Sequence, residues 1–234
     1  MGKHRGGLVA ILAGLAITTS CSGSSGGGSG GASGSSGGTG GSGTSSGASG
    51  GGAGPPADAF VSASVGPGSL SGLDDPAACS MPSALTWQVG FPVAPRPTAL
   101  ADGSTAGGGR VDAFCSVDVH TGVFDVNLSV IFQSATGGTL TVSGVVDPNA
   151  GASTGLTATF ETQGQLFRDS DCTFTQTYTG EPLPAGGRPA QGRIWGHLSC
   201  PMAAEAGLFG MGADGGPVTR TCDAEADFLF ENCN

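Results

Sequence analysis

Hydrophobic and polar residues alternate with a period of two along most of the chain after residue 57. The clearest case is a pair of segments, 111–119 and 124–132, joined by His120, Thr121 and Gly122. One face of each segment carries Val, Ala, Cys, Leu or Phe, and the other carries mainly Asp, Asn and Ser. This alternation predicts the two strands of an antiparallel hairpin with one buried face.

Shorter alternating segments predict further strands, with turns rich in Gly, Pro and Asn between them. These predicted strands are residues 57–65, 85–91, 140–146, 156–160, 172–178, 194–200 and 222–230. We expect 57–65 to be an edge strand and 201–207, which begins with Pro201, to be a short helix at most. Because no crossover helices are available for a parallel sheet, the pattern predicts an all-β fold, an antiparallel β-sandwich or jelly roll over residues 57–234.

The first 21 residues follow a different pattern. A basic start at residues 3–5 precedes an apolar run at 8–17, and the small residues 18–20 precede Cys21. This layout is typical of a signal peptide, and its apolar run is too short for a membrane-spanning anchor. The segment Thr19-Ser20-Cys21 resembles the cleavage site of bacterial lipoproteins. The resemblance covers residues 1–21 alone, and it implies that a signal helix, residues 1–20, is removed and that Cys21 is acylated. The alternative is an ordinary secretory signal with Cys21 unmodified.

A Gly/Ser tract without charge or proline runs from Ser22 to Gly54. Such a tract buries too little apolar surface to offset its chain entropy, so we expect a disordered tether with an r.m.s. span of roughly 30 Å. The predicted organisation is therefore a signal peptide (1–20), a lipidated cysteine with its tether (21–56) and a β-sandwich domain (57–234).

The seven cysteines support export. If acylation consumes Cys21, six remain, enough for three disulfides in an oxidising compartment. With Tyr178 opposite Ile194 in a hairpin, Cys172 faces Cys200, which predicts that pair; Cys200–Cys222 is the rival. The pairs that complete the first choice are Cys79–Cys115 and Cys222–Cys233.

The net charge is −10, and loss of the leader with Lys3 and Arg5 lowers it to about −12. An acidic surface of this kind repels nucleic acid and anionic membrane faces, so no nucleic-acid partner is expected. Solubility is the plain interpretation of the acidity, and binding of a cationic ligand or Ca²⁺ is the alternative.

No constellation of catalytic or metal-binding residues emerges from the sequence. The matches to the nucleophile-elbow pattern at 27–31 and 43–47 lie in the Gly/Ser tract, where composition alone produces them. The mature chain holds two histidines, His120 and His197, whereas a zinc site needs three or four convergent ligands. We therefore predict no catalytic residue, no metal and no cofactor.

Trp195 and His197 share the outer face of one predicted strand, where they are candidate ligand-facing residues. The leading functional hypothesis is a non-enzymatic interaction module of the cell envelope, anchored to a membrane through lipid on Cys21. The alternatives are a glycan-binding module and, third, a secreted hydrolase. The expected location is the outer membrane or cell surface, with a soluble periplasmic or secreted protein as the alternative.

Overall fold

The computed structural model describes residues 55–68 and 77–234, and every regular element in these ranges is a β-strand. The signal peptide, Cys21 and the tether lie outside the described residues. The long strands are β1 (Asp58–Gly66), β2 (Leu85–Val89), β5 (Gly109–His120), β6 (Val123–Gln133), β7 (Gly138–Val146), β8 (Ala152–Thr162), β9 (Gln165–Thr175), β12 (Ile194–Met211) and β13 (Pro217–Glu231). The two-residue strands are β3 (Leu100–Ala101), β4 (Thr105–Ala106), β10 (Thr177–Tyr178) and β11 (Glu181–Pro182). The predicted all-β antiparallel fold is confirmed.

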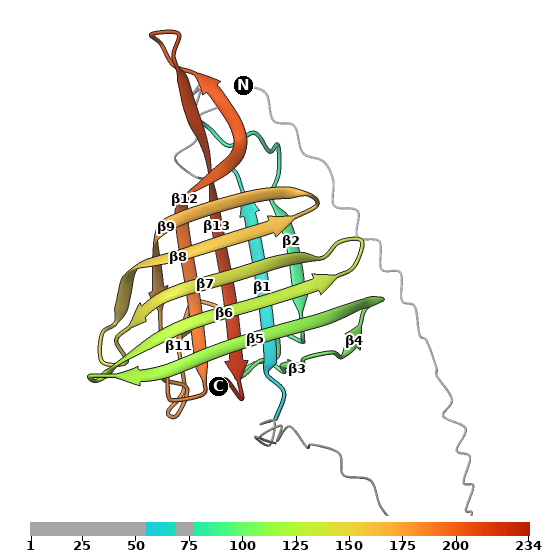
Figure 1. The fold of residues 1–234 in the computed structure, drawn as a ribbon, viewed down its shortest axis with the longest axis vertical. Coiled ribbons are helices and arrows are strands. Elements are labelled where there is room, and N and C mark those ends of the chain that lie inside the picture. The colour runs from blue at the N-terminus through green and yellow to red at the C-terminus, as the bar shows by residue number, and fades with distance from the viewer. Residues whose placement is uncertain (1–54, 69–76) are drawn as a thin grey trace, which may run out of the picture. The chain divides into compact units, whose positions relative to one another are not determined.

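One sheet contains all the strands except β10 and β11. Its order is β2-β1-β13-β12-β9-β8-β7-β6-β5-β4, with β3 paired to β1. The sheet folds over on itself, so that β5 to β9 cross steeply in front of β1, β2, β12 and β13 (Figure 1). This is the orthogonal arrangement of a two-layered β-structure.

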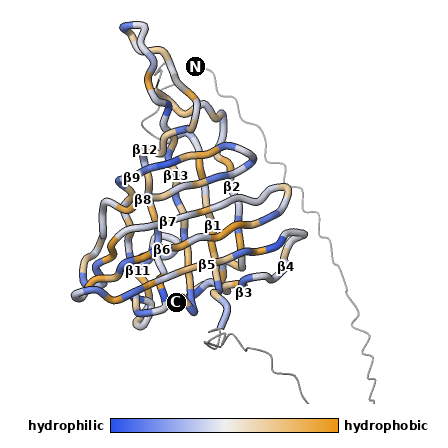
Figure 2. The backbone as a smooth tube through the Cα atoms, viewed as in Figure 1, coloured by the Kyte–Doolittle hydropathy of each residue, from blue (hydrophilic) through white to orange (hydrophobic). Residues whose placement is uncertain are grey.

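The core lies between the two layers. Hydrophobic and hydrophilic residues alternate along β5, β6 and β7, as the sequence predicts (Figure 2). The inward-facing set includes Leu128 and Phe160 from the front layer and Leu198 and Phe228 from the back layer, all fully buried. Each such side chain contributes roughly 1.5–3 kcal/mol of hydrophobic stabilisation.

The short strands β3 and β4 link the two sides of the fold. β3 pairs with the start of β1, and β4 pairs with the start of β5. The turn between them is bonded to β5 as well, because Gly103 N donates to Val111 O at 2.8 Å and Val111 N donates to Ser104 O at 2.9 Å. The sheet is therefore nearly closed at this end.

Three disulfides join the layers and the loops. Cys172–Cys200 links β9 to β12, and the register of His197 opposite Thr175 continues the predicted alignment of these strands, so this prediction is confirmed.

The other two predicted pairs are wrong, because the bonds are Cys79–Cys222 and Cys115–Cys233. The prediction paired cysteines that are near in sequence. In the folded chain, Thr221 N donates to Ala77 O, which places Cys222 beside the loop of Cys79, and Asn234 N donates to Cys115 O.

Two strand predictions also need correction. The segment 201–207 is part of β12 and not a helix, because it continues the pairing of that strand with β13. β1 is not an edge strand, since it lies between β13 on one side and β2 and β3 on the other.

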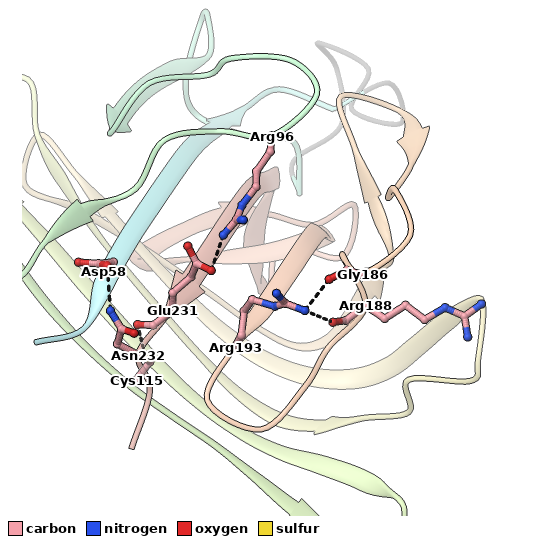
Figure 3. Close-up of polar contacts among 8 residues, drawn as sticks. All are labelled: Asp58, Arg96, Cys115, Gly186, Arg188, Arg193, Glu231 and Asn232. Atoms are coloured by element: carbon pink, nitrogen blue, oxygen red, sulfur yellow. Dashed lines mark hydrogen bonds and ion pairs between the residues drawn. The ribbon is translucent and has the colours of Figure 1, made fainter. Parts of the chain in front are cut away.

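Polar contacts fix the loops around the end of β13 (Figure 3). Arg96 forms an ion pair with Glu231, and Asn232 Nδ2 donates to Asp58 Oδ2 at 2.9 Å. Arg193 donates to the carbonyl oxygens of Gly186 and Arg188. Partial burial, together with the nearby Glu231 carboxylate, raises the pKa of Asp58.

A substitution at Gly196 tests the packing between β12 and β9. A Cβ atom at this position would overlap the ring of Phe174 and the carbonyl oxygen of Thr175. We expect Gly196→Ala to lower the free energy of unfolding by about 1–3 kcal/mol. Gly151→Ala is the matched control, because a Cβ there meets nothing within 4 Å. Urea unfolding curves measure both, and equal midpoints for the two variants would contradict the packing described.

Candidate functional site

His197 and Asp227 form a pair on the outer face of the back layer. They lie opposite each other in the register of β12 and β13, and Nδ1 of His197 is 3.0 Å from Oδ1 of Asp227. Both side chains are partly buried. The hydrogen bond to Asp227 raises the pKa of His197, burial opposes this, and the charges of Asp227 and Glu225 add to it.

Hydroxyl groups surround this pair, and none of them completes a catalytic triad. Ser62 of β1 lies opposite Asp227, and Thr175 of β9 lies opposite His197. Thr175 Oγ1 is bonded to Thr177 Oγ1 at 2.8 Å. A nucleophilic hydroxyl would have to bond the second ring nitrogen of the histidine, and the described residues provide no such bond.

Trp195 lies on the same outer face, as its parity predicts, but its ring is not available to a ligand. It is 2% exposed and packs with Phe60, Tyr178 and Leu229. The segment of β10 and β11 supplies Tyr178, whose ring centroid is 5.7 Å from that of Trp195. The expectation that Trp195 faces a ligand is therefore wrong, because the buried ring leaves no exposed face on which a glycan could stack.

The remaining candidate polar residues lie apart from this pair. His120 is exposed at the end of β5, and its Nδ1 is 3.6 Å from Asp125 Oδ2. Glu225 and Asp223 line the same face of β13 as Asp227. Within the described ranges, the two clusters of possible metal ligands are Cys79, Glu205 and Cys222, and Asp169, Cys172 and Cys200. Each contains a disulfide, whose sulfurs are not thiolate ligands.

A projecting hairpin, which the alternation of the sequence does not predict, lies at the far end of β12 and β13. β12 pairs with β9 as far as Glu205 opposite Phe167, but with β13 as far as Met211 opposite Pro217. Residues 206–220, which we call the arm, therefore extend beyond the body of the sheet (Figure 1). Leu208 and Met211 are 41% and 65% exposed on the arm.

A cavity of about 260 Å³ lies in the fork where the arm separates from β9. Its walls are residues 164–167 on one side and Glu205, Ala206 and Leu208 on the other. We call this cavity the notch.

Glu205 is 4% exposed, which is unusual for a carboxylate. Its Oε1 accepts hydrogen bonds from Ser80 N at 2.8 Å and Ser80 Oγ at 2.9 Å, and it contacts Cys222 Sγ at 2.9 Å. Its Oε2 is buried, and none of the residues that the structure describes donates a hydrogen bond to it. In the sequence, Glu205 is the one acidic residue of the segment 201–207. The alternation of hydrophobic and polar residues did not indicate that its side chain is buried.

Two further depressions lie nearby. One, of about 390 Å³, lies between β2 and the end of β6, and the other, of about 220 Å³, lies between the β6–β7 turn and the β8–β9 turn. Phe132 lines both of them. Trp87 Nε1 and Thr162 Oγ1 are buried beside them, and neither has a hydrogen-bond partner within residues 55–68 and 77–234. His197 lines neither these depressions nor the notch.

The chain matches no protein-family model, and no curated protein or solved structure is significantly similar to it. Among the described residues, no helix is long and apolar enough to cross a membrane.

The pair of His197 and Asp227 predicts a pH dependence of stability. Since the folded pKa of His197 is raised above its ordinary value of 6.5, protonation stabilises the fold. This contribution is complete below about pH 6.5 and is lost as the pH rises through the folded pKa. We expect His197→Gln to remove it, by less than about 1 kcal/mol because the pair is partly solvated. Urea unfolding from pH 5 to 9 measures the effect, with His120→Gln as the control that keeps it.

Proposed function

We propose that the chain is an exported, membrane-anchored interaction module that binds a basic protein of the cell envelope through the arm. The observation that carries this proposal is the arm itself, which leaves the sheet and exposes Leu208 and Met211. Exposed apolar side chains on a projecting element are typical of protein–protein contacts. The notch at the base of the arm adds a concave surface beside them.

Charge supports the choice of a basic partner. The chain carries 18 acidic residues against 8 basic ones, for a net charge of −10. A surface of this sign speeds encounter with a positively charged protein and disfavours acidic ones. The only strongly buried carboxylate among the described residues, Glu205, lies at the notch.

The proposal assigns no reaction to the pair of His197 and Asp227. The pair lies on a sheet surface, outside the notch and the two other depressions. The hydrogen bond between the two side chains, together with the raised pKa of His197, makes the pair a stabilising contact between β12 and β13.

The three disulfides support export, because such bonds persist in oxidising compartments. They use six of the seven cysteines and leave Cys21 available for acyl chains. Two or more acyl chains provide a stable anchor, and the Gly/Ser tract then has a fixed start from which the domain can search for its partner. We propose the outer membrane or cell surface as the location.

Cys21→Ala tests the anchor. We expect the mature protein to begin at Cys21 with the added mass of acyl chains, and the variant to lose both this mass and its membrane association. Mass spectrometry of the amino-terminal peptide and fractionation of cells measure the two effects. An unshifted mass in the natural chain, with an unchanged membrane fraction in the variant, would reject lipidation.

The double substitution Leu208→Ser with Met211→Ser tests the arm. We expect the full-length protein, crosslinked in intact cells, to capture a basic envelope protein. The purified partner should then bind the double variant at least about tenfold more weakly, because exposed apolar anchors dominate such contacts.

The matched control is Phe114→Ser with Val145→Ser. These side chains are 52% and 50% exposed on β5 and β7, away from the arm. The control should bind the partner like the natural chain. Equal loss in both double variants, or no loss in either, would exclude the arm as the binding surface.

A further inference from the structure

We propose that the two depressions that share Phe132 form one groove, and that this groove binds a neutral oligosaccharide. The inference goes beyond the proposed protein partner, because residues 206–220 of the arm line neither depression. It is carried by a partly exposed aromatic ring that lies beside exposed hydroxyl and amide side chains.

The two depressions meet at one side chain. Phe132 lines both of them, and the β6–β7 turn that follows it contributes Thr136 to the larger depression and Ala135 to the smaller one. Their volumes are about 390 and 220 Å³. Sites for small molecules in proteins are typically clefts of about 300–1,000 Å³. The groove therefore has the size of a site for a ligand that extends past Phe132 from one depression into the other.

Phe132 supplies an apolar binding face. It has the inward parity of β6, but it lies near the end of that strand, where its side chain is partly exposed. Gly109, at the start of β5, leaves the space that the ring fills, because a Cβ atom there would lie 2.6 Å from Cε2 of Phe132. The ring is thus fixed before a ligand arrives. The face of an aromatic ring is electronegative, so it attracts the C–H groups on the flat side of a sugar ring.

Trp87 also lines the larger depression, but it is 4% exposed and contributes packing rather than a binding face. The proposed contacts use side chains that solvent reaches. The groove also differs in this respect from the surface over Trp195, whose ring is 2% exposed.

Hydroxyl and amide groups line the larger depression beside Phe132. Thr86 and Gln88 lie on the outer face of β2, and Thr136 lies in the turn after β6; all three are exposed. Gln88 Nε2 donates to the carbonyl oxygen of Gly90 at 2.9 Å, which orients the amide and leaves its oxygen as an acceptor. Within the described residues, no hydrogen bond occupies the hydroxyl groups of Thr86 and Thr136. Hydroxyl groups donate and accept, so this set matches the hydroxyl groups of a sugar.

The charge of the groove selects an uncharged ligand. Among the described residues, no acid or base lines the larger depression, although the chain has a net charge of −10. Glu161 lines the smaller depression, where it is exposed and can accept hydrogen bonds from sugar hydroxyl groups. A carboxylate on an acidic protein repels uronic acids and sulfated sugars. Neutral saccharides therefore fit the groove best.

An extended peptide is the competing ligand, because β2 ends the sheet and pairs with β1 alone among the described strands. A peptide added to β2 would bond mainly to the backbone of that strand. Its binding would therefore survive removal of the hydroxyl groups of Thr86 and Thr136. A saccharide depends on these hydroxyl groups, and this difference separates the two ligands.

The test uses the full-length protein and an array that displays neutral, uronic-acid and sulfated oligosaccharides. We expect neutral glycans to bind and the anionic ones not to bind. The neutral glycan that binds most tightly is then titrated into isotope-labelled protein. Saturable changes in the amide chemical shifts of Gln88, Phe132 and Thr136 are expected. The peptide acetyl-Thr-Val-Thr-Val-Thr amide is titrated in parallel.

Phe132→Leu removes the flat ring and keeps an apolar side chain in the core. We expect this variant to bind the saccharide at least about tenfold more weakly, because the stacking face is lost. The matched control is Phe114→Leu, the same substitution at a ring on β5 that is 52% exposed and lines neither depression. The control should bind the saccharide like the natural chain.

Two further variants keep the proposal testable if Phe132→Leu does not fold. Thr86→Val and Thr136→Val each remove one exposed hydroxyl group and should weaken saccharide binding about three- to tenfold, the usual net effect of one hydrogen bond. Thr141→Val is the matched control, because Thr141 lies on the outer face of β7 and outside both depressions.

Four results would overturn the proposal: no neutral glycan binds, anionic glycans bind more tightly, the peptide binds at the groove more tightly than the glycan, or the folded groove variants bind the saccharide as tightly as their controls. The double variant Leu208→Ser with Met211→Ser should keep saccharide binding, and Phe132→Leu should keep the envelope partner. Failure of the saccharide site would therefore leave the proposed interaction function standing, and the reverse also holds.

Discussion

Strand β12 belongs to both layers of the fold, and the rest of the structure depends on this double pairing. One edge of β12 bonds to β13 in the back layer, and the other bonds to β9, which leads into the front layer. The sheet can fold over on itself only at a strand that is hydrogen-bonded to strands on both sides of the fold. Cys172–Cys200 fastens this corner, and the absence of a side chain at Gly196 lets the ring of Phe174 pack against β12.

An irregularity in β12 explains the position of the buried acid. The register with β13 shifts by one residue between Cys200 and Ala203. A one-residue bulge exchanges the faces of the residues that follow it, so the inward parity passes from Cys200 to Ala203 and Glu205. A regular strand would have directed the side chain of Glu205 to the outside. The bulge thus places the carboxylate of Glu205 on the buried face, where Ser80 donates hydrogen bonds to it.

Local alternation was sufficient to predict the strands and the register that pairs Cys172 with Cys200, because both depend on residues close in sequence. The bonds of Cys79 and Cys115 depend on how the sheet folds over, and their sequence separations from their partners are 143 and 118. Composition and periodicity contain no such information. Trp195 was placed on the correct face, yet the cover provided by Tyr178 comes from a segment with no alternation of its own. Glu205 could not be predicted, because its orientation follows from the bulge.

The place of β13 in the sheet has a consequence for the order of folding. β13 follows every other strand in the chain, and it is the central partner of both β1 and β12. β1 is synthesised early, and its pairing with β13 cannot form until that strand, more than 150 residues later in the chain, has been synthesised. Such long-range pairing is slow, because the loop must close before the contacts stabilise it. The front-layer meander from β5 to β9 can form first from neighbouring strands, and the back layer assembles on it when β13 arrives.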